Sequence, residues 1–295
     1  MAKKMECGRM RIAALMTCYN RVETTLSCLK HLFAARLPKD VVFDVWLNDD
    51  GCTDGTGEKC RAFFSEKKRI GWQGDGHVLK GSGHDYWCGG MRRAWVAAID
   101  SGMDYDGYLW LNDDTFLNED AFAELLISEE ALVVGAISAS DGVSDTYGGY
   151  DAKGDVVKHN GTVQEVERVN GNVVWVSRKV FEKIGNFDSH WTHALGDGDY
   201  SLRVREAGMQ ILLTANFVGQ CERNMKLADW VNPKASFLKR VKNLYSPLGY
   251  AEPPLWFRYC RRHYGLFVAI RGWVLQHVRV CIPEIWVGKL GGVRK

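Results

Sequence analysis

The stretch Val41-Val-Phe-Asp-Val-Trp-Leu47 runs directly into Asn48-Asp-Asp-Gly-Cys-Thr-Asp-Gly-Thr56. The first part has the length and apolar content of a buried strand, and the second part consists of turn-forming residues. The same change from apolar to polar occurs in Arg11-Ile-Ala-Ala-Leu-Met-Thr-Cys-Tyr-Asn20 and in Tyr108-Leu-Trp-Leu-Asn-Asp-Asp114. A strand that ends in polar residues is therefore a recurring unit of this chain.

Helical periods alternate with these strands, at residues 22–33, 58–67 and 90–101. Two further elements follow, a strand at 172–177 and a short helix at 179–184. Alternating strands and helices predict an α/β fold with a mostly parallel central sheet that helices flank on both faces. Ligands of such sheets bind at the carboxyl ends of the strands, where the polar clusters of this sequence lie.

The chain has 295 residues, of which 46% are hydrophobic and 25% charged, so it is expected to form one or two globular domains. This composition excludes a disordered, collagen-like or disulfide-stapled small protein. No stretch of about 20 uncharged apolar residues is present, because charged residues and Pro283 interrupt residues 266–287.

The nine cysteines are odd in number and form no CxxC pair, which favours reduced thiols in a cytoplasmic protein. The basic start lacks the apolar segment of a signal peptide.

Charge divides the chain into two predicted parts, a domain at 1–233 and a basic, aromatic-rich helical tail at 234–295. The tail holds 12 Lys and Arg against two acids, a net charge of +10, whereas the remainder carries −8. Aromatic rings interleaved with basic residues suit a helix in the headgroup region of an anionic membrane. No segment resembles a base-reading motif, so nucleic acid is not an expected partner. A helical cap on the core, with a solvated basic face, is the alternative. The tail residues concerned are Trp256, Phe257, Arg258, Tyr259, Arg261, Arg262, Tyr264, Phe267, Arg271, Trp273, Arg279 and Trp286.

Asn112, Asp113 and Asp114 follow a strand and offer hard oxygen ligands. Such ligands suit Mg²⁺ or Mn²⁺, which keep several waters and take further ligands from substrate phosphates. An Asx turn at the end of the strand is the alternative.

Asp49 and Asp50 occupy the same position one unit earlier, where a carboxylate can accept hydrogen bonds from a base or a ribose. Thr17 and Tyr19 follow the first strand and are candidates to bond to and stack on that base. A simple turn at Asp49 and Asp50, and a packing role for Tyr19, are the alternatives.

Asp197 and Asp199 lie at the predicted start of a helix, where the helix dipole stabilises carboxylates. Beside a sugar donor, an acid there is a candidate general base for an attacking hydroxyl. For Asp199 the alternative is an ion pair with Arg203, four residues on. For Asp197 it is an N-cap.

The segment Gly81-Ser-Gly-His-Asp-Tyr-Trp-Cys-Gly-Gly-Met-Arg-Arg93 combines glycines with two arginines before a helix. It is a candidate phosphate site through backbone N–H groups and charge. The P-loop spacing GxxxxGKS/T is missing, and no GxGxxG opens the first helix, so an NTPase loop and a dinucleotide fold are disfavoured. For Arg92 and Arg93 the alternative is ordinary surface charge.

In their order, these motifs resemble the family-2 glycosyltransferases of the GT-A fold over about residues 11–225. The segment 48–56 is similar to the family's DDGSTDGT, and Asn112-Asp-Asp114 stands in the place of its DxD motif. Gly185-Asn-Phe-Asp188 and Gly196-Asp-Gly-Asp-Tyr-Ser-Leu-Arg203 are similar to its GGFDE…EDxDLxxR. Trp87, Gly89 and Gly90 match the Gly-rich donor loop of rhamnosyltransferase-like members.

The resemblance implies a role for each matching residue. Asp197 would be the catalytic base, and Asp114, with Asn112 or Asp113, would bind the metal that bridges the donor diphosphate. His190, Trp191, His193 and Asp199 would face the acceptor, with packing or surface exposure as the alternative for the first three. The donor-binding residues would be Thr17, Tyr19, Asn20, Asp49, Asp50, Trp87, Gly89, Gly90, Arg93, Asn112 and Asp113.

Three positions depart from the family pattern. Gly196 replaces the Glu that precedes the base, and Asn112 replaces the first acid of the DxD triplet. Cys221 or Glu222 stands near the place of a histidine that often completes the metal site, and a thiolate is a poor partner for Mg²⁺.

The expected function is inverting, metal-assisted transfer of a sugar from a UDP- or dTDP-sugar to a hydroxyl of a glycan or lipid-linked acceptor. Bacterial surface-polysaccharide synthesis of the O-antigen or capsule type, at the cytoplasmic face of the inner membrane, is the expected setting, and a homo-oligomer is possible. The alternatives are a catalytically inactive sugar- or membrane-binding scaffold and, less favoured, a nucleotidyltransferase.

Overall fold

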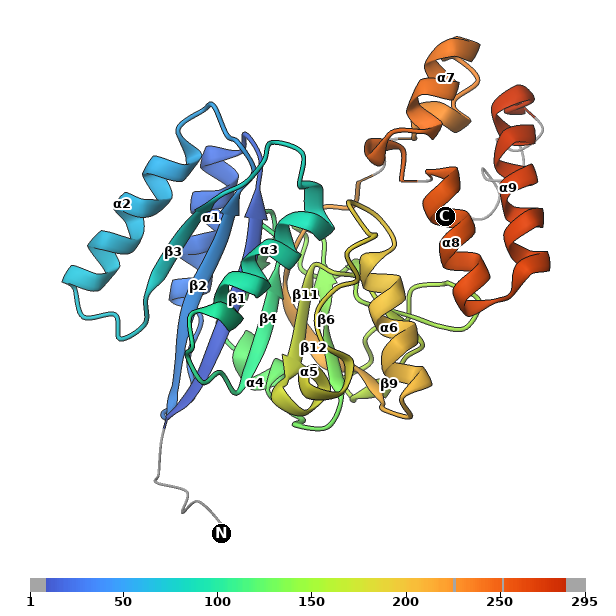
Figure 1. Cartoon of the computed structure of the whole chain (residues 1–295). Helices are drawn as coiled ribbons and strands as arrows, with labels where there is room; N and C mark the ends of the chain where they lie inside the picture. Colours follow the sequence, from blue (N-terminus) through green and yellow to red (C-terminus); the bar gives the residue numbers. More distant parts are fainter. Residues whose placement is uncertain (1–8, 225–226, 251, 285–295) are drawn as a thin grey trace.

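A ten-stranded sheet runs through the centre of the molecule, with helices on both faces (Figure 1). The computed structural model describes residues 9–224, 227–250 and 252–284. The strand order along the main path is β3-β2-β1-β4-β11-β6-β12-β5. The strands are β1 (Met10–Cys18), β2 (Val41–Asp49), β3 (Gly76–Lys80), β4 (Gly107–Leu111), β5 (Phe116–Leu117), β6 (Leu132–Ser138), β7 (Asp145–Tyr147), β8 (Gly149–Tyr150), β9 (Gln164–Glu165), β10 (Arg168–Val169), β11 (Val173–Ser177) and β12 (Ile211–Gln220).

The first four strands are parallel, which confirms the predicted type of sheet. β1 pairs with β2 and β4, and β2 pairs with β3, all in parallel. β11 is antiparallel to both its neighbours, β4 and β6, while β12 returns parallel to β6. The register places Thr17 opposite Asn48 and Cys18 opposite Asp49. The polar residues after β1 and β2 therefore meet at one edge of the sheet, as parallel strands require.

Helices cover each face of the sheet because the parallel strands are apolar on both sides. The helices are α1 (Val22–Ala34), α2 (Thr56–Arg69), α3 (Tyr86–Asp100), α4 (Ala121–Leu125), α5 (Arg178–Ile184), α6 (Gly196–Glu206), α7 (Phe237–Leu244), α8 (Pro253–His263) and α9 (Leu266–Cys281). Ala13 and Leu15 of β1 face a core that includes Trp95 of α3 and Tyr200 of α6. The alternate residues of β1 face the core of α1, α2 and α4.

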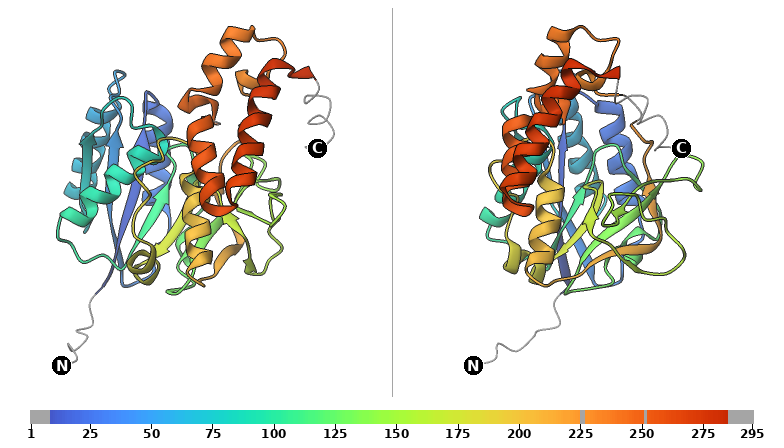
Figure 2. Two further views of the ribbon diagram at one scale, coloured as in Figure 1. Left: turned by 45° about the vertical axis from the view of Figure 1, so that its right-hand side comes forward. Right: turned by 90° about the vertical axis from the view of Figure 1, so that its right-hand side faces the viewer.

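The C-terminal helices pack on the sheet domain, and Figure 2 shows α8 lying beside α6. Tyr259 and Cys260 of α8 and Ala269 of α9 are buried in the same core as Trp95. A cap on the core, the alternative in the sequence, therefore describes α8. Among the described residues no helix combines the length and the apolar content needed to cross a bilayer. Trp286, part of the predicted tail, lies outside the described residues.

Helix α3 begins at Tyr86, four residues before the start predicted from periodicity. Buried Asp50 is the reason, since its carboxylate accepts hydrogen bonds from the backbone N–H groups of Gly83, Asp85 and Tyr86. The N–H of the first helical residue and two N–H groups of the preceding loop thereby gain a partner that local sequence does not reveal. The other predicted elements match observed ones to within two residues at either end.

Candidate active site

Thr17 and Asn48 form the floor of the site where β1 and β2 end. The Asn48 amide nitrogen donates to Thr17 Oγ1 at 3.3 Å. Helix α3 approaches this pair closely at Gly90, because a Cβ there would lie 2.2 Å from Thr17 Oγ1. Gly90 therefore acts through the close packing of α3 on Thr17. Tyr19, just after β1, is 57% exposed, so its ring is free to stack on a ligand.

Asp49, Asp50 and Asn20 organise the loops around that floor. The Asp50 carboxylate accepts hydrogen bonds from the residues at the start of α3. This corrects the expectation that its oxygens are free for a nucleoside. Asp49 Oδ1 accepts from the N–H of Cys52 at 2.8 Å, which is the turn that the sequence offered as an alternative. Asn20 Oδ1 accepts from the N–H of Thr53 at 2.8 Å.

The Gly-rich loop has little hydrogen-bonding capacity left for a phosphate. Its N–H groups at 83, 85 and 86 go to Asp50, and that of Gly89 goes to the carbonyl of Thr192 at 2.9 Å. Arg93 pairs with Asp85 through two hydrogen bonds, at 2.7 and 3.0 Å. Arg92 donates to the backbone carbonyls of 188 and 191. These contacts correct the prediction of a backbone phosphate cradle.

The triplet after β4 is bound together by Arg21, which lies at the exit of β1. One guanidinium nitrogen, Nη1, is 3.1 Å from Asp113 Oδ1 and 2.8 Å from Asp114 Oδ2. Asp113 is buried and also accepts from Thr25 Oγ1 at 3.1 Å. Burial raises the pKa of the Asp113 carboxyl to about 6, although Arg21 opposes this shift. The side chain of Asp114 is 37% exposed.

The donor set of the triplet fits Mg²⁺ or Mn²⁺ through Asp114, because these ions need only one or two protein carboxylates beside substrate phosphates. Asp113 lies directly behind it, and Asn112 Oδ1 already accepts from the Trp87 indole N–H at 2.6 Å. Cys221 Sγ is 3.8 Å from Asp114 Oδ1, but burial raises the pKa of its thiol to about 12. Glu222 is occupied by the N–H of Ser140. Neither Cys221 nor Glu222 is therefore assigned as a third metal ligand.

A different group of potential metal ligands lies where β1 and β2 end. Cys18, Asp49 and Cys52 bring three ligand atoms within 4.8 Å of one another, and the two sulfur atoms are 3.9 Å apart. Burial raises the pKa of both thiols, that of Cys52 to about 11. Protonated thiols do not suit Mg²⁺ or Mn²⁺.

Asp197 is held at the start of α6 by two backbone groups. Its Oδ1 accepts from the N–H of Gly198 at 2.8 Å and its Oδ2 from the N–H of Gly171 at 3.2 Å. The side chain is half-buried and lines a cavity, and burial raises its pKa. A carboxylate with a raised pKa is a stronger general base.

Trp87 joins the triplet to this carboxylate. Its indole N–H donates to Asn112, and the six-membered part of its ring lies against Gly171, where an added Cβ would be 2.3 Å from Cζ2. Gly171 in turn donates to Asp197. Residues from the loop after β4, from α3, from the loop before β11 and from α6, up to 110 positions apart in the chain, therefore lie together.

Gly196 has a steric explanation. A Cβ at this position would lie 2.3 Å from the sulfur of Cys88 on α3. The close approach of α3 and α6 therefore excludes the Glu that the family pattern places before the base.

The cavity beside Asp197 has a volume of about 230 Å³. Helix α8 supplies one of its walls through Trp256 and Tyr259, and Arg168 of β10 contributes a cation. Sequence reasoning missed these three residues for this site, since no motif contains them. The complete lining consists of Tyr150, Gly154, Arg168, Val169, Asn170, Leu195, Asp197, Gly198, Trp256 and Tyr259.

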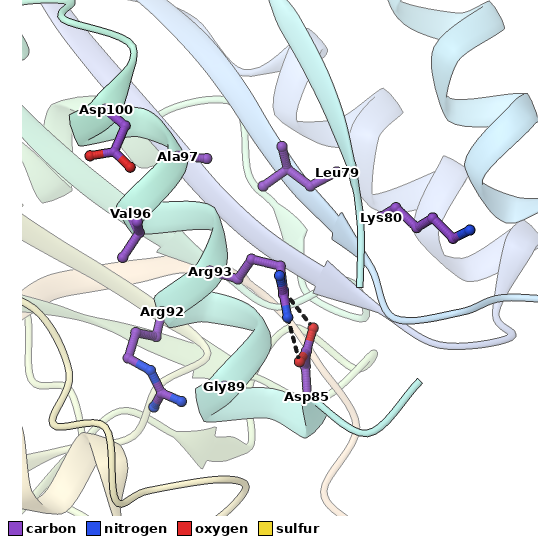
Figure 3. Close-up of a pocket in the computed structure, with 9 residues that line it drawn as sticks. All are labelled: Leu79, Lys80, Asp85, Gly89, Arg92, Arg93, Val96, Ala97 and Asp100. Atoms are coloured by element: carbon purple, nitrogen blue, oxygen red, sulfur yellow. Dashed lines mark hydrogen bonds and ion pairs between the residues drawn. The ribbon is translucent and has the colours of Figure 1, made fainter. Parts of the chain in front are cut away.

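A larger hollow of about 510 Å³ lies against the outward face of α3 (Figure 3). Its helical lining residues follow a period of three and four, whereas Met91, Trp95 and Ala98 face the core. Three cations, Lys80, Arg92 and Arg93, and two acids, Asp85 and Asp100, line it, and Arg93 is paired with Asp85. Asp197, the candidate base, lines the smaller cavity and not this hollow, so the smaller cavity is the one that adjoins the candidate base.

Four predicted acceptor residues have different surroundings. The Trp191 side chain is fully buried, and Asp199 is fully buried among Arg203, Arg262 and His263, so neither can contact an acceptor. Both expectations are corrected to the packing and ion-pair alternatives. His190 is 2.6 Å from the carboxylate of Asp188 on the surface.

His193 remains a candidate for the acceptor side. Desolvation lowers its pKa to about 4, so the ring is neutral at physiological pH. Its Nδ1 accepts from the N–H of Trp87, and its buried Nε2 has no hydrogen-bond partner among the described residues. The ring also lies 4.8 Å from that of Tyr250.

The sequence matches no protein-family model and no curated protein. Similarity to solved structures is clear. A mannosyltransferase from Pyrobaculum calidifontis, PcManGT, in complex with GDP-Man and Mn²⁺, aligns over 98% of this chain and 77% of its own, with 13% identity and a TM-score of 0.51. GalNAc-T7 with UDP, GalNAc and Mn²⁺ aligns over 90% of this chain and 56% of its own, with 11% identity and a TM-score of 0.55. The chain therefore has the α/β fold of GT-A glycosyltransferases, as the motifs predicted.

Proposed function

We propose that this protein is an inverting glycosyltransferase that moves a sugar from a nucleotide-diphosphate donor, a UDP- or dTDP-sugar, to an acceptor hydroxyl. The observation that carries the proposal is the link from Asn112 through Trp87 and Gly171 to Asp197. This link supports a single site that combines Asp113 and Asp114, carboxylates suited to a diphosphate-bound cation, with Asp197 as the carboxylate base. The solved structures of similar fold hold nucleotide or nucleotide sugar with Mn²⁺.

In this reaction Asp197 accepts the proton of the attacking hydroxyl, and its two backbone hydrogen bonds fix its direction. Asp114 binds Mg²⁺ or Mn²⁺, with Asp113 and Asn112 as supporting residues. The metal, when bound, neutralises the charge that develops on the leaving diphosphate. Arg21 is a second cation at this position and is held between Asp113 and Asp114.

The nucleoside side of the donor site is proposed to lie over the ends of β1 and β2. Tyr19 offers an exposed ring there, and Thr17 offers a hydroxyl. Asp50 acts by fixing the loop before α3, since its oxygens are used by that loop. Asn20, Asp49, Gly89, Gly90 and Arg93 shape the surrounding loops.

The test compares Asp197→Asn with the wild type in donor binding and in turnover. Calorimetric titration with UDP-, dTDP- and GDP-sugars, with and without Mn²⁺, is expected to show one preferred nucleotide. Asp197→Asn should bind it with unchanged affinity while transfer falls about 10²- to 10⁴-fold, because the variant loses only the proton acceptor. Asp155→Asn, which changes an exposed carboxylate, is the matched control.

Asp114→Ala should abolish the effect of Mn²⁺ on donor binding. Unchanged transfer in Asp197→Asn would refute the assignment of the base. Absence of binding to every nucleotide sugar would favour the inactive scaffold. The ion pairs of Arg21 with Asp113 and Asp114, the proposed metal-binding residues, are the observation in favour of that alternative.

We further propose that α9 holds the enzyme on an anionic membrane surface where lipid-linked acceptors are available. The outward face of α9 is apolar: Phe267 is 80% exposed and Ile270 50%, while Gln276 is buried. A helix that packs only on a protein core has the opposite pattern, with its apolar side chains buried and its polar side chains exposed. The net charge of +10 over residues 234–295 complements an anionic lipid surface.

Such a location is consistent with synthesis of bacterial surface polysaccharide at the cytoplasmic face of the inner membrane. The apolar face would be covered by lipid, and self-association through the same face is the outcome that would oppose this proposal. Co-sedimentation with anionic and neutral vesicles measures membrane binding, and sedimentation analysis of the free protein measures self-association.

A further inference from the structure

The cavity beside Asp197 contains a cation that the proposed chemistry does not yet use. Arg168 lines it, half-buried, next to the carboxylate that serves as base. The acids that flank it in sequence, Glu165 and Glu167, pair with Arg205 of α6 instead. Arg168 makes no ion pair with any carboxylate in the part of the chain that the structure describes. Its charge therefore faces the cavity, where Asp197 is close enough to feel it but forms no ion pair with it.

Arg168 does not simply neutralise Asp197. The two side chains line the same cavity but form no direct ion pair. The oxygens of Asp197 accept hydrogen bonds from the N–H groups of Gly171 and Gly198. A half-buried guanidinium that forms no ion pair is available to a ligand, and a carboxylate or phosphate is the partner that its planar donors match best.

The remaining walls suit a sugar ring. Trp256 and Tyr259 of α8 and Tyr150 of β8 provide aromatic surface, and their rings carry polar groups at one end. Asn170 adds an amide. A volume of about 230 Å³ is below the roughly 300–1,000 Å³ of pockets for drug-sized ligands, so the cavity has room for about one sugar residue.

We infer that this cavity is an acceptor subsite for a sugar that carries an anionic group, with Arg168 as the specificity-determining residue. This inference rests on the proposed glycosyltransferase function. The anion pairs with Arg168, the sugar ring lies against Trp256, and a hydroxyl of the same sugar reaches Asp197. The proton goes to Asp197, the hydroxyl oxygen forms the new bond to the anomeric carbon, and the nucleoside diphosphate leaves with the electron pair of the broken bond.

The shared chemistry of the ligand is an anion on a hexose, and it has two sources, the carboxylate of an acidic sugar or the phosphate of a glycosyl phosphate. Three probes distinguish them: methyl glucuronide, glucose 1-phosphate and the neutral methyl glucoside. Binding of each to the full-length protein is measured by saturation-transfer NMR titration, and nucleotide-sugar binding is measured on the same samples.

One of the charged probes is expected to bind at least about tenfold more tightly than methyl glucoside, since it alone forms the charge-assisted bond. Arg168→Gln should remove this preference, and Arg168→Lys should restore part of it. Arg261→Gln removes an exposed arginine of α8 and should leave all affinities unchanged. Trp256→Leu should weaken all three probes alike.

Charged probes can also bind at the cationic hollow on α3, so Arg92→Gln is included. Loss of the preference in Arg92→Gln with retention in Arg168→Gln would overturn the inference, as would equal binding of charged and neutral probes. If the nucleotide sugar binds while the preference is missing, the inference alone fails. If no nucleotide sugar binds, the proposed function itself fails.

Discussion

Asp199 should be among the most sensitive positions of the fold, because it joins α6 to α8 through charges buried from solvent. Its side chain is 0% exposed, accepts hydrogen bonds from Arg203 Nε at 2.9 Å and His263 Nε2 at 3.0 Å, and lies 3.1 Å from Arg262 Nη1 in an ion pair. The substitution Asp199→Asn keeps the size of the side chain and removes its charge. Arg203 then loses its carboxylate partner inside the fold, whereas Arg262 keeps its ion pair with Asp188 at 2.9 Å.

Removing one partner of a buried ion pair costs about 3–5 kcal/mol. At about 2–4 °C per kcal/mol for chains of 150–250 residues, the melting temperature should fall by roughly 6–20 °C. Asp104→Asn is the matched control, because Asp104 pairs with Arg178 but its side chain is 87% exposed. An exposed pair contributes at most about 1 kcal/mol.

Thermal unfolding followed by circular dichroism measures both variants, and urea unfolding gives the free energy. Because α8 carries Trp256 and Tyr259, Asp199→Asn should also weaken acceptor binding while donor binding persists. A melting temperature of Asp199→Asn equal to that of Asp104→Asn would refute the reasoning, and would return Asp199 to the acceptor role suggested by its sequence position.

Three further predictions concern other parts of the molecule. The pKa of His193 is lowered to about 4, so the unfolded chain takes up a proton below about pH 6.5 that the folded protein does not; stability should fall by about 2 kcal/mol from pH 7 to pH 5 in urea unfolding, and by less in His193→Gln. Gly196→Ala should cost about 1–3 kcal/mol through contact with Cys88, and a Cys88→Ala background should relieve at least half of this; additive effects in the double-mutant cycle would contradict the contact. Phe267→Glu should reduce co-sedimentation with anionic vesicles, whereas Val143→Glu, at another exposed apolar residue, should not; equal losses would argue against a specific face.

The sequence predicted the type of fold, and suggested a candidate site, because both depend on local patterns. Apolar runs of strand length and helical periods repeat along the first half of the chain, and such alternation leaves few arrangements other than a mostly parallel sheet. Parallel strands then bring the polar residues that follow them to one edge, which is why Thr17, Asn48 and the triplet after β4 could be grouped without coordinates.

The roles of individual side chains were harder to predict, since each depends on which partner arrives from elsewhere in the chain. Asp50 reads as a free carboxylate in its motif, but the start of α3, more than 30 residues away, takes its oxygens. Gly196 reads as a lost functional residue, but Cys88 leaves no room for a side chain there.

The sequence by itself determined the order of the elements, the α/β fold and the identity of the base candidate, because these follow from periodicity and from motifs within short segments. Only the tertiary structure decided that Arg21 lies on Asp113 and Asp114, that His263 and Arg262 bury Asp199, and that α8 forms a wall of the cavity at Asp197. These contacts join residues about 60 to 90 positions apart, and no local pattern encodes which distant charge or ring will meet a given carboxylate.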